Sequence, residues 1–137
     1  MTYEIFKSIP HQRVVSRQAN TDEIFDLYQC GIFNNNSLEE NIELVELQPQ
    51  SEYRPHYHKN STAVVYIISG TGLFRLADKL IEYQPGLRMV ISAGVLHGFK
   101  TQTPTLFLSI QSPPIIDPEN GQIDLHYETG VNDEAQS

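Results

Sequence analysis

From residue 41 onward, short apolar runs alternate with breaks that are rich in turn-forming residues. The runs have four to six residues each: IELVEL, AVVYII, GLFRL, LIEY, LRMVI and TLFLSI. Gly, Pro and Ser recur in the breaks, such as QPQS, SGTG, QPG and SAG. Several short strands at this spacing are typical of an all-β sandwich or barrel. A turn at Asn120-Gly121 and a late strand near 122–128 extend the pattern.

The run AVVYII, residues 63–68, is apolar at every position, which differs from the alternation of a strand with one face in water. One face of this strand is expected to line the interior of a barrel. The other face then needs a cover, either the N-terminal segment of the same chain or a second subunit. We therefore expect a homodimer, with burial against the chain itself as the alternative.

The segment NTDEIFDLYQCG, residues 20–31, predicts one short helix before the strands begin. Asn20 is a suitable cap, and Ile24, Leu27 and Tyr28 recur at helical spacing. Gly31 is a suitable helix end. The sequence thus divides into an N-terminal strand and helix extension that packs on the barrel (1–40), the barrel itself (41–128) and a flexible tail (129–137).

Composition and charge exclude several partner classes. With 137 residues and a formal net charge of −8, the chain is expected to be a single domain that repels nucleic acid. No apolar run approaches the roughly 18 residues of a membrane helix, so no membrane contact is expected. The first residues contain no apolar signal-peptide core, and Cys30 is the only cysteine. Together these features predict a cytoplasmic protein.

Two histidines in the stretch RPHYHKN are candidate metal ligands. Residues i and i+2 of a strand share a face about 6.6 Å apart, so His56 and His58 point the same way. Two imidazoles at this spacing can reach one cation. His97 lies about 40 residues further on. That separation suits a return to the same site across neighbouring strands.

The joint spacing of these histidines with three glycines resembles the cupin family. Its two motifs are G-x5-H-x-H-x4-E-x6-G and G-x5-P-x-G-x2-H-x3-N. The first falls on His56, His58 and Gly70, and the second on Gly86, Gly94 and His97. The resemblance covers about residues 41–112. It implies a cupin-type jelly roll, or double-stranded β-helix barrel, and one divalent metal ion held by His56, His58 and His97. Iron, manganese, nickel, zinc and copper all accept imidazole ligands, so the donor type does not choose among them.

The chain departs from the family motifs at four positions: Gln50, Ala63, Ser92 and Thr101. Ala63 matters most, because it replaces the glutamate that usually completes the ligand set. Three interpretations stay open. The metal is held by three histidines alone, as in some family dioxygenases; another carboxylate such as Glu52 substitutes; or the site has degenerated and binds no metal.

The resemblance implies a metal-binding cupin that acts on a small, anionic molecule, with dioxygenation as one possible reaction. Arg54 shares the parity of the histidines and is a candidate to bind the anion. Phe99 is a second candidate for substrate contact, although core packing also explains it. The enzyme class stays open among oxygenase, lyase and isomerase. The rival hypothesis is a non-catalytic protein that binds a small ligand. A third possibility, a vestigial pocket, predicts an interior filled by large side chains such as Phe74, Met89 and Phe99.

Overall fold

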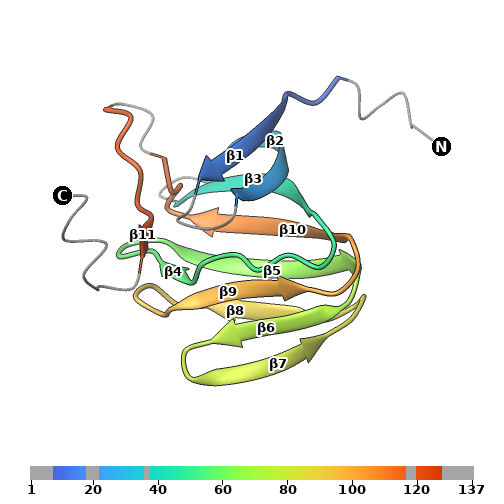
Figure 1. Cartoon of the computed structure of the whole chain (residues 1–137). Helices are drawn as coiled ribbons and strands as arrows, with labels where there is room; N and C mark the ends of the chain where they lie inside the picture. The colour runs from blue at the N-terminus through green and yellow to red at the C-terminus, as the bar shows by residue number, and fades with distance from the viewer. Residues whose placement is uncertain (1–7, 18–21, 36–37, 117–119, 128–137) are drawn as a thin grey trace.

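A computed structural model of the chain describes residues 8–17, 22–35, 38–116 and 120–127. Within them, eleven strands form two antiparallel sheets (Figure 1). The strands are β1 (His11–Arg17), β2 (Asp22–Asn35), β3 (Leu38–Leu47), β4 (His56–Tyr57), β5 (Thr62–Ser69), β6 (Gly72–Leu76), β7 (Lys79–Tyr83), β8 (Arg88–Ile91), β9 (His97–Thr101), β10 (Thr105–Ser112) and β11 (His126–Tyr127). In this part of the chain, no helix offers the length and apolar character that crossing a membrane requires.

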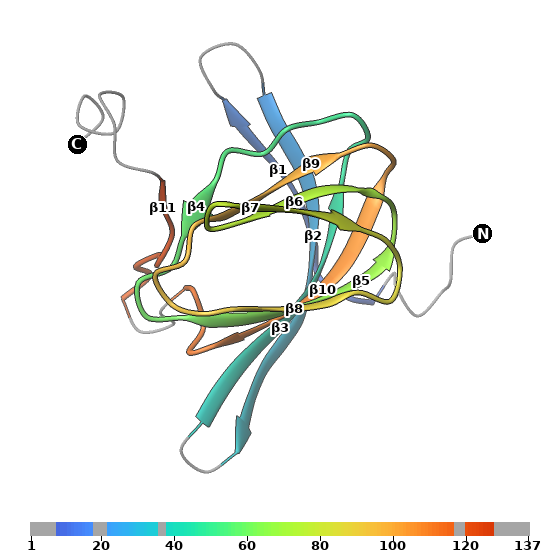
Figure 2. The same ribbon diagram turned by 90° about the horizontal axis from the view of Figure 1, so that it is seen from below.

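The two sheets face each other and enclose the core. One has six strands in the order β1-β2-β3-β10-β5-β8, and the other has five in the order β11-β4-β9-β6-β7. Figure 2 looks along the barrel and shows both sheets curving around a common interior. The predicted all-β cupin barrel is therefore confirmed. The tail predicted for 129–137 lies outside the described residues.

Alternating burial along β5 confirms that one of its apolar faces lines the barrel. Ala63, Val65 and Ile67 are buried, whereas Ile68 is 48% exposed on the outer side. The N-terminal strand β1 joins the edge of the same sheet. A second subunit over the outer face of β5 stays a prediction.

The helix predicted over residues 20–31 is wrong, because the described residues of this segment belong to strand β2. Ile24, Leu27 and Tyr28 have helical spacing, whereas Phe25 and Leu27, which pack against the core, have the period of two that a strand requires. Tertiary pairing decides between them, since β1 and β3 flank β2 on both sides. Gly31, at φ 126°, follows a register shift between Gln29 and Gly31 and is no helix cap.

Aromatic side chains fill the barrel interior next to His97. Phe74 is fully buried, and its ring meets that of Phe99 edge to face with centroids 4.8 Å apart. Across the interior, Phe99 stacks on Phe107 at 4.9 Å. One step further from the histidines, the Tyr83 hydroxyl bonds that of Thr105 at 2.7 Å. These contacts fix how the two sheets are aligned.

Two turns show why the motif glycines recur. Gly70 has φ 106°, and a Cβ atom there would lie 2.5 Å from the backbone oxygen of Pro104, so only glycine fits. Gln50 occupies the position of the first motif glycine and takes φ 48°. The chain therefore keeps the left-handed backbone of that turn at a cost of about 1 kcal/mol for a side chain.

Candidate metal centre

Three histidines converge on the inner side of the five-stranded sheet. His56 in β4 and His97 at the start of β9 are direct partners in the antiparallel register. Their ring centroids lie 4.4 Å apart, and each is 5.1 Å from the ring of His58. One potential ligand nitrogen from each residue lies within 4.8 Å of the others. The sequence prediction that these three residues meet is confirmed by this geometry.

Backbone carbonyls fix which ring nitrogen of two of these histidines carries hydrogen. The Nδ1 atom of His58 donates to the Asp124 carbonyl at 2.6 Å, and that of His97 donates to the Val95 carbonyl at 2.9 Å. His56 Nδ1 makes a longer contact of 3.5 Å with the Arg54 carbonyl. Since a carbonyl can only accept, these Nδ1 atoms are protonated and the Nε2 lone pairs stay free. Such orientation by a partner on the second nitrogen is typical of metal-binding histidines.

Burial keeps all three imidazoles uncharged at neutral pH. Burial, together with the neighbouring rings of His97 and His58, lowers the pKa of His56 to about 3. Burial likewise lowers the pKa of His97 to about 4 and lowers that of His58. Neutral imidazole is the form that binds a cation, so the electrostatics suit a metal ligand. The residues present thus fit a divalent ion.

No carboxylate within the described residues joins the three histidines as a fourth ligand. Ala63, at the motif glutamate position, is buried on the inner face of β5. Glu52 is exposed, and its backbone forms an isolated antiparallel β-bridge with that of Lys100, so it does not replace the missing acid. The ligand set offered by this cluster is three neutral nitrogens.

Arg54, the candidate anion-binding residue, lies two positions before His56. Its guanidinium stacks over the ring of Tyr127 at 3.5 Å from the centroid. Its Nε atom is buried and has no hydrogen-bond partner among the described residues. Its backbone N–H donates to the Glu23 carboxylate at 3.0 Å, and burial raises the pKa of that carboxyl. Substrate binding by Arg54 stays a prediction.

Phe99 belongs to the hydrophobic core, together with Phe74 and Met89. Large side chains therefore occupy part of the interior, as the vestigial-pocket hypothesis expects. They lie next to the histidines, since the Phe74 ring centroid is 6.2 Å from that of His97, while buried polar residues such as Ser109 and Gln111 line the inner face of the opposite sheet. A substrate contact by Phe99 stays a prediction.

The segment 120–127 contributes to the centre, although sequence reasoning assigned it no role there. The Asp124 carboxylate accepts hydrogen bonds from three consecutive backbone N–H groups, those of Lys59 (2.7 Å), Asn60 (2.8 Å) and Ser61 (3.1 Å). These bonds lower its pKa, while burial acts in the opposite direction. Because the Asp124 carbonyl also holds His58, this residue ties the C-terminal strand to the histidines. A lone aspartate 66 residues from its partner carries no sequence signal.

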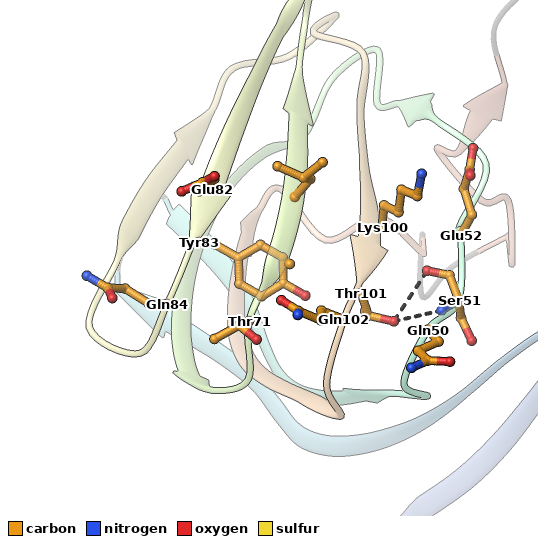
Figure 3. A pocket seen from close by; sticks show the side chains of 12 residues that line it. Gln50, Ser51, Glu52, Thr71, Glu82, Tyr83, Gln84, Lys100, Thr101 and Gln102 are labelled. Carbon is orange, nitrogen blue, oxygen red and sulfur yellow. Dashed lines mark hydrogen bonds between the residues drawn. The ribbon is translucent and has the colours of Figure 1, made fainter.

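A separate pocket of about 850 Å³ lies at the other end of the five-stranded sheet (Figure 3). Glu52, Glu82 and Lys100 contribute charged side chains to it. Thr101 in its wall is hydrogen-bonded to the Ser51 backbone, as the dashed lines in Figure 3 show. None of the three histidines lines this pocket. We place the candidate site at the histidines, because among the described residues neutral ligand atoms converge only there.

Solved structures share this fold at low sequence identity. A cupin 2 conserved barrel protein from Rhodopseudomonas palustris aligns with a TM-score of 0.70 and 14% identity, over 94% of this chain and 83% of its own. A cupin-2 domain protein from Rhodospirillum rubrum gives 0.67 and 15%, over 92% and 80%. KdgF from Halomonas sp. gives 0.55 and 19%, over 64% and 79%. Identities this low support the fold alone.

Comparison with curated protein sequences gives no match. The sequence model of the Cupin_2 family, described as a cupin domain, matches residues 43–111. This range contains all three histidines and seven of the barrel strands from β4 to β10, in agreement with the fold described above. The chain therefore belongs to the Cupin_2 family.

Proposed function

We propose that the protein binds one divalent metal ion through the Nε2 atoms of His56, His58 and His97, and acts there on a small anionic molecule. The observation that carries the proposal is the convergence of three uncharged histidines within 4.8 Å. Carbonyl groups that orient the rings support it. Iron, manganese, nickel, zinc and copper remain the candidate ions, because imidazole suits all of them.

Three neutral ligands would leave the ion its full positive charge. When bound, such an ion supplies Lewis-acid or oxygen-activating chemistry to a coordinated substrate. The protein's own residues then bind and orient the substrate. The buried Arg54 Nε, without a partner among the described residues, is a donor available to an anionic group. This unsatisfied donor supports an anionic substrate.

We infer that the reaction takes place at the metal and does not rely on a side chain that shuttles protons beside it. Support comes from the absence of any Asp, Glu or Cys in the described part of the histidine cluster. Dioxygenation of a small acid is the specific reaction that we propose to test first. A non-catalytic ligand-binding role is the second candidate, and the alanine at position 63 favours it because the usual anionic ligand is lost.

Metal analysis of the protein purified without a histidine tag tests the proposal. We expect about one ion per chain in the wild type and loss of most of it in His97→Ala, since two imidazoles bind an ion far more weakly than three. His11→Ala is the matched control, because His11 lies outside the cluster, in β1, and bonds Asp26. Equal, near-zero metal content in wild type and His97→Ala would refute the metal centre.

Oxygen uptake by the iron-loaded protein then separates enzyme from binding protein. A panel of small carboxylic acids, thiols and diketones serves as substrates. Uptake that depends on both iron and His97 supports a dioxygenase. Saturable binding of an acid with no uptake and no product supports the non-catalytic role.

A further inference from the structure

Glu43 presents a half-buried carboxylate to the barrel interior, and the groups that hold it among the described residues are neutral. It shares the inward face of β3 with Val45. Its oxygens accept hydrogen bonds from the side-chain amides of Gln111 (2.6 Å), Asn41 (3.2 Å) and Gln29 (3.3 Å). No cation among the described residues pairs with it.

Buried polar side chains surround this carboxylate on the inner face of the sheet, and we call Asn41, Glu43, Ser109 and Gln111 the polar wall. Asn41, Ser109 and Gln111 are 8%, 4% and 3% exposed. Gln111 also bonds Asn41 and Ser109, so the side chains fix one another. Burial raises the pKa of Glu43, and the three amide donors oppose that rise. An inward, half-buried position costs a carboxylate free energy relative to an apolar residue, so packing does not explain the choice of residue.

The alignment of the two sheets places this wall opposite the histidines. Phe99 of β9 stacks on Phe107 of β10, and the Tyr83–Thr105 hydrogen bond lies on the side away from His97. His97 precedes Phe99 by two residues in β9, and Ser109 follows Phe107 by two residues in antiparallel β10. Both therefore lie one step further from the Tyr83–Thr105 hydrogen bond. Ser109 pairs directly with Glu43 in the register. Glu43 therefore lies on the sheet that faces the histidines, at about the same level.

Ala63 lies beside the same wall. It pairs with Gln111 across β5 and β10, and Gln111 in turn pairs with Asn41 of β3. Packed sheets are about 10 Å apart. Beside the small side chain at position 63, the polar groups of this sheet near the histidine level are Gln111, Ser109 and Glu43.

We propose that Glu43 is a second recognition point in the barrel, which accepts a hydrogen bond from the far end of the ligand. This inference rests on the proposed function for the metal-side end of the ligand. Since a carboxylate has about four acceptor positions and three amides approach it here, one position remains for the ligand. The class of ligand is a small carboxylate that carries a hydroxyl or ammonium group at its other end.

A pair of isosteric acids tests the inference on the full-length, zinc-loaded protein. In 4-hydroxybutyrate a terminal hydroxyl replaces the methyl group of pentanoate, so the two differ only in the donor. We expect calorimetry or ligand-observed NMR to show that the wild type binds 4-hydroxybutyrate about tenfold more tightly. Binding of 4-aminobutyrate then shows whether the site prefers ammonium to hydroxyl.

Glu43→Gln should reduce the preference to less than about twofold while the zinc content is kept. Glu46→Gln, three residues along β3 and exposed on the opposite face, is the matched control and should keep it. Equal binding of the two acids by the zinc-loaded wild type overturns the inference even if Glu43→Gln fails to fold. An unchanged preference in folded Glu43→Gln also overturns it. A wild type that binds no zinc refutes the proposed function as well, which the zinc content of each sample reveals.

Discussion

Replacement of Asp124 by alanine should damage both the stability of the barrel and its affinity for metal. The carboxylate accepts three backbone hydrogen bonds, and the N–H of Ser61 belongs to a residue that is only 1% exposed. An unsatisfied buried donor costs about 1–3 kcal/mol. The N–H groups of Lys59 and Asn60 lie at the surface, where water replaces the lost partner at about 0.5–1 kcal/mol each. The expected loss of unfolding free energy is about 2–5 kcal/mol.

Urea unfolding with a chelator present measures this loss in the metal-free protein. For a slope of about 2 kcal/mol/M, the midpoint should fall by about 1–2.5 M. Zinc affinity, measured separately by competition with a chromophoric chelator, should weaken about 10- to 100-fold, because the backbone carbonyl of residue 124 is no longer anchored in place against His58 once the carboxylate is gone.

Asp78→Ala is the control for this experiment, since Asp78 is an exposed acid in the β6–β7 turn. Its free energy of unfolding should change by less than about 0.5 kcal/mol. An Asp124→Ala protein with the wild-type urea midpoint and wild-type zinc affinity would show that Asp124 contributes neither to the stability of the barrel nor to zinc binding. A loss of stability without a loss of zinc affinity would refute the positioning role alone.

Two further predictions concern the histidines and Ala63, which stands at the position of the family glutamate. Because the pKa values of His56 and His97 fall to about 3 and about 4 on folding, the unfolded chain binds more protons below pH 6.5. The metal-free protein should therefore lose stability as the pH falls from 6.5 towards 4, by about 2 kcal/mol per histidine at pH 5. Thermal melts in chelator should show a smaller loss in His97→Gln, and equal pH slopes would contradict the assignment. Ala63→Glu should lower the melting temperature of the metal-free protein, since the new carboxylate is buried without its cation. Adding zinc should then raise the melting temperature more than it does in the wild type. A smaller zinc-induced rise in melting temperature than in the wild type would count against a ligand role at this position.

The strands after residue 41 and the histidine cluster could be predicted, because both depend on local spacing. Alternating burial follows directly from the order of residues in β5, and the H-x-H pair needs only a strand to align it. The strand β2 was missed because Ile24, Leu27 and Tyr28 have helical spacing, although Phe25 and Leu27 have the period of two that a strand requires. Only its pairing with β1 and β3 selects one of them.

The parts of the site that sequence reasoning missed depend on partners that are distant in the chain. His58 is oriented by a residue 66 positions away, and Glu43 is bonded by Gln111 at a separation of 68. Aspartate, glutamate and glutamine are common surface residues, so nothing in their local context indicates burial. Such contacts appear only when strands from both ends of the chain are placed side by side.

The histidine cluster depends on one of the shortest pairings in the barrel. β4 has two residues, and its register with β9 consists of the single pair His56 and His97. A slip by one position would turn one imidazole outward, while the hydrophobic core, held by the longer strands, would stay intact. Insertions or deletions in the connection 48–55 would therefore remove the histidine cluster from a relative that still folds. Changes in the same loop would also allow relatives with this fold to present a different set of metal ligands.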